Sequence, residues 1–147
     1  MNSIQTSFVA LVLWAGAAST HAQNDFAQLA AKEPGAKVTA SGLVFRSLQE
    51  GTGASPSATD KVKVHYRGTF PDGKEFDSSF KRNQPIDFPL NAVIPCWTEG
   101  VQLMKVGGKA KLTCPSAIAY GARGAGGVIP PNATLQFEVE LIAIAGR

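Results

Sequence analysis

The sequence predicts an α+β fold in which an antiparallel sheet packs over one short helix. Several segments alternate apolar and polar residues with a period of two, which is typical of strands that bury a single face. One segment, 94–104, instead repeats its apolar residues at helical spacing. One-sided strands combined with a single amphipathic helix favour a sheet layer and a helix layer around one core.

Length and composition fit one soluble domain with a short extension. The chain has 147 residues, of which 44% are hydrophobic and 17% charged, enough for a real core and too apolar for a disordered chain. Its net charge is +3, and the basic residues are spread from Lys32 to Arg147. Such a mild, dispersed charge gives little support for nucleic-acid binding, so we expect no nucleic-acid partner.

Residues 1–22 are typical of a secretory signal peptide. The apolar run from Phe8 to Ala18 is shorter than the roughly 20 residues that span a bilayer, and Thr20-His21-Ala22 forms a small-x-small site before Gln23. No Lys or Arg precedes the apolar run, so a non-cleaved anchor is the alternative. We predict cleavage before Gln23, no stable membrane insertion, and a mature protein in the bacterial periplasm or outside the cell, an oxidising environment.

Residues 23–41 form a short N-terminal extension or linker ahead of the domain predicted at 42–147. Phe26, Leu29 and Ala30 have the spacing of one or two helical turns, and Glu33-Pro34-Gly35 then stops the helix.

The first half of the domain is predicted to be strands. A strand at 43–48 leads into a turn-rich loop, and the next strand, 61–67, has the clearest alternation, with Tyr66 pointing inward. Pro71-Asp72-Gly73 is a turn signal before a short strand through Phe76. These two strands therefore form a hairpin.

The second half is predicted to hold the helix and two more strands. The apolar face of the helix consists of Ile94, Trp97, Val101 and Met104, and the helix ends at Gly107-Gly108. Segments 109–114 and 135–141 each alternate strictly, so both are expected to be half-buried strands.

Common catalytic and cofactor motifs are missing. The predicted mature chain has a single histidine, His65, on the polar face of its strand, and no set of His, Cys or carboxylate residues has metal-ligand spacing. No nucleophile with a base and an orienting group can be assembled. The glycines between Gly121 and Gly127 lack the context and the Gly-Lys-Ser/Thr ending of a phosphate loop. We therefore predict no metal and no cofactor.

An aromatic set remains as the candidate site. Inward strand positions, the helix and the late loop supply Tyr66, Phe76, Phe88, Trp97, Tyr120 and Phe137. Inward aromatic residues are usually core. Two features favour a binding pocket instead: Trp97 lies in the first turn of the helix beside Val93-Ile94, and Asp77 directly follows an inward aromatic residue, where a plain core would hold no carboxylate.

Four segments in this order resemble the FKBP family of peptidyl-prolyl cis/trans isomerases, and in particular its secreted, Mip-like bacterial members. They are Val64-His65-Tyr66-Arg67-Gly68, Phe76-Asp77-Ser78-Ser79, Val93-Ile94-Pro95-Cys96-Trp97-Thr98-Glu99-Gly100 and the glycine-rich stretch from Ala119 to Pro131. The resemblance runs from about Gly42 to Ile144. It implies a five-stranded sheet curved around one helix and isomerisation of bonds preceding proline.

The resemblance also implies a pocket, with Trp97 as its floor. The other family positions that line it match Tyr66, Phe76, Asp77, Phe88, Val93, Ile94, Tyr120 and Phe137, while Val128 and Ile129 match the overhanging loop and Arg82 matches an arginine near the aspartate. On this reading Tyr66, Phe76, Asp77, Tyr120 and Phe137 act in catalysis and the others bind substrate. Ile86 departs from the phenylalanine of many members, which bears on peptide preference.

The resemblance further implies partners. Proline-containing polypeptides and macrolide inhibitors such as rapamycin are expected to bind the pocket. Mip-like relatives often carry a long helical dimerisation arm, for which residues 23–41 are too few, so a monomer is expected. The alternative functions are a prolyl-peptide or macrolide binding module or chaperone with little turnover and, third, a structural or inhibitor-type secreted domain.

The two cysteines are predicted to form a disulfide. In an exported chain Cys96 and Cys114 can pair only with each other or stay free. Cys114 points inward on its strand, and Cys96 lies in the first turn of the helix that this strand should cover. Two buried thiols are the alternative.

Overall fold

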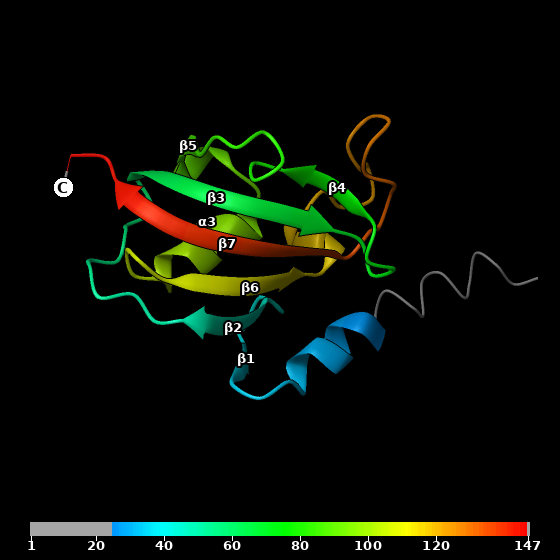
Figure 1. Cartoon of the computed structure of the whole chain (residues 1–147). Helices are drawn as coiled ribbons and strands as arrows, with labels where there is room; N and C mark the ends of the chain where they lie inside the picture. The colour runs from blue at the N-terminus through cyan, green and yellow to red at the C-terminus, as the bar shows by residue number, and fades with distance from the viewer. Residues whose placement is uncertain (1–24, 147) are drawn as a thin grey trace, which may run out of the picture.

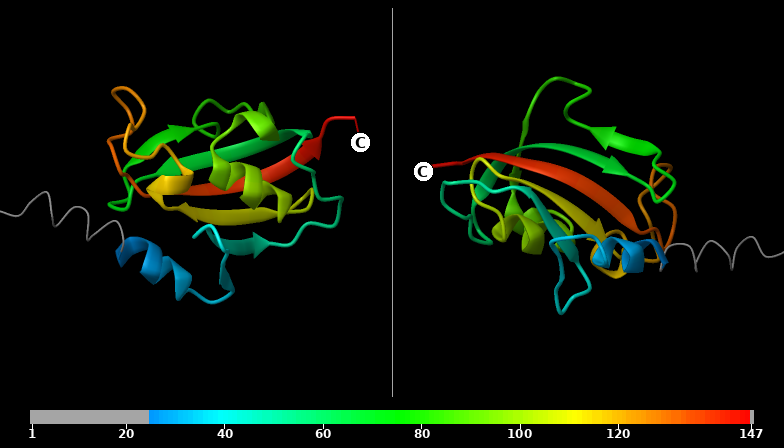
Figure 2. Two further views of the ribbon diagram at one scale, coloured as in Figure 1. Left: turned by 180° about the vertical axis from the view of Figure 1, so that it is seen from behind. Right: turned by 60° about the horizontal axis from the view of Figure 1, so that its bottom comes forward.

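The computed structural model describes residues 25–146, and in it an antiparallel sheet curves around one short helix (Figures 1 and 2). The strands are β1 (Ala36–Val38), β2 (Val44–Gln49), β3 (Lys61–Thr69), β4 (Glu75–Ser78), β5 (Ile86–Pro89), β6 (Lys109–Cys114) and β7 (Leu135–Ile144). Helix α3 (Pro95–Gln102) and two 3₁₀ turns, η2 (Leu90–Ala92) and η3 (Ser116–Ile118), complete the domain. The predicted α+β fold is confirmed.

The sheet has more strands than the five expected. Its order is β1-β2-β6-β7-β3-β4, and β5 also pairs with β3. Strands β4 and β5 both pair with the same edge of β3. The chain leaves β3 after Ser78 and pairs with it again from Ile86, so this edge is covered by two short strands instead of one. At the other edge β1, which comes from the extension, pairs with β2.

The core lies between the central strands and α3. Strand β3 buries alternate residues, and its neighbour β7 does the same with Tyr66 opposite Val139. Helix α3 crosses the concave face of the sheet and turns Trp97 and Val101 toward it. A Cβ added at Gly100 would lie 2.9 Å from the Leu112 side chain. The glycine therefore allows α3 to pack closely against β6.

Helix α3 is shorter than predicted. It ends at Gln102, and the N–H of Leu103 donates back to Gly100 in a tighter turn. Met104 is still buried, as its spacing predicted. Gly107, where the helix was expected to end, has a φ of 94° and donates its N–H to Leu141 at 2.9 Å, so the chain has already joined the sheet at this point.

The N-terminal extension contacts the sheet. Residues 25–31 are helical. Beyond them Glu33 forms an ion pair with Lys111 at 2.8 Å, and Arg46 donates to the Pro34 carbonyl at 2.9 Å. Thr113, on the polar side of β6, is only 1% exposed. The end of the extension thus lies against β2 and β6 rather than hanging free.

The predicted signal peptide lies outside the described residues. Within residues 25–146, no helix has the length and the apolar character required to cross a membrane.

Candidate active site

A cavity of about 460 Å³ opens between the concave face of the sheet, the start of α3 and the loop after β6. It is lined by Tyr66, Phe76, Asp77, Phe88, Ala92, Val93, Ile94, Trp97, Tyr120 and Phe137. The structure therefore brings together all the residues expected to line the pocket and adds Ala92, a small residue with no chemical signal of its own in the sequence.

Trp97 forms the floor, held by three other rings. Its indole is 4% exposed. The centroids of Tyr66, Phe88 and Phe137 lie 5.3, 5.4 and 5.5 Å from it, each in an edge-to-face arrangement. Edge-to-face contacts at this separation are the favoured geometry of aromatic pairs, so the floor is rigid and apolar.

A glycine in β3 makes room for the wall beside this floor. Phe76 and Phe137 pack edge to face at 5.7 Å. A Cβ added at Gly68 would lie 2.5 Å from the Phe76 ring and 3.0 Å from the Phe137 ring. Glycine is therefore required here by the two rings rather than by a turn.

The Asp77 carboxylate is held by three donors. The Tyr66 hydroxyl donates to its Oδ2, and Arg82 and the Ser78 N–H donate to its Oδ1 at 2.8 and 2.9 Å. Burial raises the pKa of Asp77, but the Arg82 and Tyr66 hydrogen bonds together outweigh burial and leave that pKa below its ordinary value. Burial, with the Asp77 hydrogen bond, raises the pKa of Tyr66. A carboxylate and a neutral phenol are thus fixed side by side.

Arg82 lies behind this pair rather than in the cavity wall. Its Nη2 also donates to the Tyr66 hydroxyl at 3.3 Å, and the Asp77 hydrogen bond raises its pKa. Its position is that of a group that orients Asp77 and Tyr66, although the family resemblance implied a substrate-binding residue.

Ser79 is a functional candidate that sequence reasoning missed. Its side chain is fully buried, and its Oγ accepts the Tyr66 N–H at 2.7 Å and lies 2.8 Å from His65 Nδ1. His65 in turn stacks on Phe80 at 4.5 Å, so it is packed rather than simply solvated. Ser79 fixes the backbone of Tyr66 from outside the cavity. The sequence feature that could have pointed to Ser79 is its position as the second serine of Phe76-Asp77-Ser78-Ser79.

Two polar groups at the cavity have no partner among residues 25–146. The N–H of Ile94, the residue before the first turn of α3, donates no hydrogen bond there. The Tyr120 side chain is 40% exposed, and its hydroxyl has no partner within the same residues. Both groups are available to a ligand in an otherwise apolar pocket.

The overhanging loop does not place its two apolar residues in this cavity. Ile129 is 6% exposed and belongs to the core, held by paired hydrogen bonds of 2.9 Å with Ala125. Val128 is 55% exposed and lines a separate hollow shared with Phe26 and Leu29 of the extension. The loop closes on its own backbone, so the two side chains point away from the pocket.

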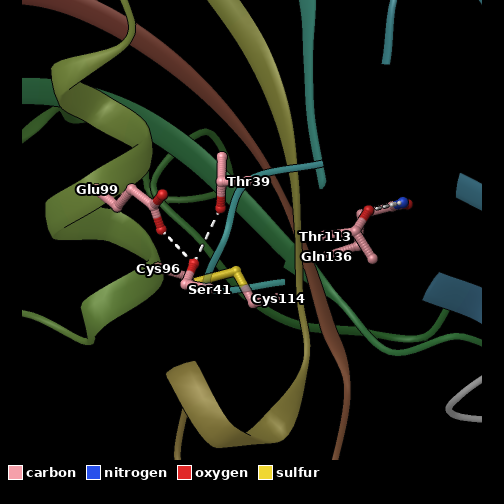
Figure 3. The surroundings of a disulfide bond; sticks show 7 residues. All are labelled: Thr39, Ser41, Cys96, Glu99, Thr113, Cys114 and Gln136. Atoms are coloured by element: carbon pink, nitrogen blue, oxygen red, sulfur yellow. Dashed lines mark hydrogen bonds between the residues drawn. A yellow bond between two sulfur atoms is a disulfide. The ribbon is translucent and has the colours of Figure 1, made fainter. Parts of the chain in front are cut away.

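The predicted disulfide is present. Cys96 in the first turn of α3 is bonded to Cys114 at the end of β6, with the Cα atoms 5.9 Å apart (Figure 3). Both cysteines are fully buried. Because Cys96 immediately precedes Trp97, the bond ties the pocket floor to the sheet. No cluster of potential metal ligands occurs in the part of the chain that the structure describes.

Comparison with known proteins agrees with this geometry. A family model described as "FKBP-type peptidyl-prolyl cis-trans isomerase" matches residues 53–142. The chain is 60% identical over 114 residues to the FKBP-type peptidyl-prolyl cis-trans isomerase FkpA of Aeromonas hydrophila, covering 78% of this chain and 42% of that protein. It is 54% identical over 114 residues to the FKBP-type 22 kDa isomerase of Escherichia coli K12, covering 78% of this chain and 55% of that protein.

Solved structures show the same fold. FkpA from Escherichia coli superposes with a TM-score of 0.84 at 44% identity, over 87% of this chain and 60% of that one. A peptidyl-prolyl cis-trans isomerase from Pseudomonas syringae superposes with a TM-score of 0.80 at 44% identity, over 87% of this chain and 94% of that one. The chain spans about half the length of the curated relatives it matches.

Proposed function

The chain belongs to the FKBP-type peptidyl-prolyl cis-trans isomerase family, and we propose that it accelerates cis/trans isomerisation of the bond preceding proline in exported polypeptides. The observation that carries this proposal is the apolar, aromatic-walled cavity with a fixed carboxylate on its wall and two unpartnered donors. A proline ring fits such a cavity, and the donors suit the carbonyls on either side of it.

The chemistry follows from the amide. Rotation about the C–N bond sacrifices resonance, which gives a barrier of about 18–20 kcal/mol and exchange over tens to hundreds of seconds. The planar amide is more polar than the twisted one. A dry pocket therefore destabilises the ground state relative to the transition state, and groups that hold the twisted geometry add to this effect.

Each part of the pocket then has a role. Trp97, Val93, Ile94 and Phe88 receive the pyrrolidine ring, and Tyr66, Phe76 and Phe137 direct ring edges toward the carbonyl oxygen that precedes proline. The Ile94 N–H and the Tyr120 hydroxyl anchor the peptide carbonyls. An acceleration of about 10⁶ needs about 8 kcal/mol, to be shared between desolvation, selection of the twist and these hydrogen bonds.

Asp77 acts mainly through Tyr66. Its oxygens already accept bonds from Tyr66, Arg82 and the Ser78 N–H. The carboxylate therefore sets the orientation of the Tyr66 ring and the field at the pocket wall, and no proton is transferred during rotation.

A binding module or chaperone with little turnover is the second candidate. The exposed Tyr120 hydroxyl and the anchored Asp77 favour the enzyme, because holding a proline ring alone requires neither.

The two functions are separated by isomerisation of an X-Pro peptide, measured with and without rapamycin. The enzyme predicts accelerated exchange that the macrolide blocks, whereas tight macrolide binding without turnover indicates the module.

Three variants locate the site. Asp77→Val should lower kcat/KM far more than it lowers Tm. Tyr120→Phe should reduce transition-state stabilisation by about 0.5–1.5 kcal/mol. Trp97→Ala should lower activity, and it should also lower the free energy of unfolding by about 3–5 kcal/mol. Wild-type turnover in Asp77→Val would place catalysis elsewhere.

The natural setting is also part of the proposal. We expect a periplasmic or secreted monomer, for which the predicted signal peptide and the buried disulfide are the support. Size-exclusion chromatography with light scattering tests the monomer, and the intact mass of exported protein tests cleavage before Gln23.

A further inference from the structure

A second cavity, of about 590 Å³, adjoins the prolyl pocket on the side of α3. Its apolar lining includes Val93, Pro95, Leu103 and Ile118, and its polar lining includes Ser41 and Glu99. We call it the α3 groove. Val93 lines both the groove and the prolyl pocket, so the two cavities are neighbours.

Glu99 is the one charged residue that lines the α3 groove among residues 25–146. The Ser41 hydroxyl donates to its Oε1, and Ser41 is itself 3.0 Å from the Thr39 hydroxyl (Figure 3). No Lys, Arg or His of those residues forms an ion pair with Glu99. The carboxylate is therefore held in one place while its charge is left uncompensated by the protein.

The placement of the prolyl ring gives the direction of the chain. In the proposed function, Tyr66, Phe76 and Phe137 hold the carbonyl before proline on the sheet side of the pocket. The chain after proline then leaves on the opposite side, past the Ile94 N–H and over Val93. Because Val93 also lines the α3 groove, this path leads toward the groove.

We propose that the α3 groove binds the segment of substrate that follows the proline, and that Glu99 selects a lysine or arginine side chain in this segment. The inference rests on the proposed function, whose substrate preference it names. A long basic side chain fits both features of the groove, because its aliphatic stem lies on apolar residues such as Leu103 while its charged end reaches a carboxylate.

The expected preference is modest. Glu99 is half-buried, and an ion pair at such a position is weak and is screened by salt. Peptides with lysine after proline should therefore have a kcat/KM about fivefold to tenfold above that of matched peptides with glutamate, and the ratio should fall as ionic strength rises.

The test compares nine X-Pro peptides with the full chain, three for each of three positions after proline. They carry lysine, norleucine or glutamate at the first, second or third position after proline, and their cis/trans exchange is measured by NMR. Glu99→Gln should reduce the lysine-to-glutamate ratio to about one. Glutamine can still accept the Ser41 hydroxyl bond, so the fold should be kept, as Tm checks.

Glu138→Gln is the matched control, because it removes the same charge from an exposed position on the outer face of β7. It should leave the lysine preference intact. A wild-type ratio near one at all three positions, or a preference that survives Glu99→Gln, overturns the proposal.

A second readout separates this inference from the proposed function. In ¹⁵N-labelled protein the lysine peptide should shift the amides of Thr98, Glu99 and Gln102 more than the glutamate peptide does, without any need for turnover. Absence of exchange with every peptide rejects the isomerase. Equal amide shifts with the lysine and glutamate peptides reject the α3 groove.

Discussion

At the scale of single residues, Tyr66 and Asp77 fix the charge of the pocket over a wide pH range. The pKa of Asp77 lies below its ordinary value of 3.8, and the pKa of Tyr66 lies above its ordinary value of 10.0. Neither group changes its charge near neutral pH. We therefore expect kcat/KM, measured by NMR exchange, to be constant between about pH 5 and pH 9.

The same pKa shift has a consequence for stability. A carboxyl whose pKa is lower in the folded state stabilises the fold fully above its unfolded pKa and loses that contribution as the pH falls through the folded value. The stability difference between wild type and Asp77→Asn should thus be constant at neutral pH and shrink in acid below about 3.8, the ordinary value for aspartate. A step in kcat/KM between pH 5 and pH 7 would contradict the constant charge of the Tyr66–Asp77 pair.

Sequence alone predicted most of the pocket lining, because the inward positions of the strands all face the concave side of the sheet. Tyr66 and Phe137 follow from alternation, and Trp97 from its position in the first helical turn. The direction of the Val128 side chain could not be predicted, since it depends on how the loop closes through the hydrogen bonds between Ala125 and Ile129. The role of Ser79 was also hidden, because its partner is a backbone N–H that no side-chain pattern records.

At the scale of elements, the glycine-rich loop has one position that requires glycine for two reasons. Gly124 has a φ of +70°, and a Cβ there would lie 2.3 Å from the Ile129 carbonyl oxygen. Gly124→Ala should therefore rearrange the loop that carries Tyr120, lowering stability by about 1–3 kcal/mol and reducing kcat/KM.

Gly126→Ala is the control for this prediction, because no atom lies within 4 Å of a Cβ added there and its φ is not positive. It should change stability by less than about 0.5 kcal/mol. Equal effects of the two substitutions on urea unfolding would show that the loop lacks the closed shape described here.

The disulfide also acts at the scale of elements, since it links α3 to β6 across a sequence separation of 18. In the chain-entropy model, closing a loop of this length stabilises the fold by about 3 kcal/mol. Reductant should lower the unfolding free energy of wild type by about that amount and leave a Cys96→Ala/Cys114→Ala variant unchanged. Alkylation of denatured, non-reduced protein should find no thiol, and two reactive thiols would contradict the pairing.

Element boundaries were predictable where the alternation is strict and hard to predict where tertiary contacts decide them. Strand β6 has the bounds expected from its sequence. Strand β5 was expected only through the inward position of Phe88, and its bounds could not be predicted because Ile86–Pro89 is too short to show a period. The end of α3 was placed too late, because the apolar spacing continues to Met104 while the backbone already turns toward the sheet at Leu103.

At the scale of the whole molecule, the N-terminal extension adds contacts but little core. Of the buried hydrophobic residues that the structure describes, only Ala30 precedes residue 42. The extension contributes β1, the Glu33–Lys111 ion pair and the Ser41 hydroxyl bond to Glu99. The boundary at residue 42 was predicted from where the family resemblance begins and from the strand-like pattern that follows it. The pairing of β1 depends on β2 and had no signal of its own.

A chain shortened to residues 42–147 should therefore fold cooperatively and retain isomerase activity. Its unfolding free energy should fall by about 1–3 kcal/mol, because exposed ion pairs and edge hydrogen bonds each contribute about 1 kcal/mol or less. Its preference for lysine after proline should weaken, since Ser41 no longer holds Glu99. Urea unfolding and NMR exchange of the X-Pro peptides measure both effects. Failure of the shortened chain to unfold cooperatively would show that the extension belongs to the domain itself.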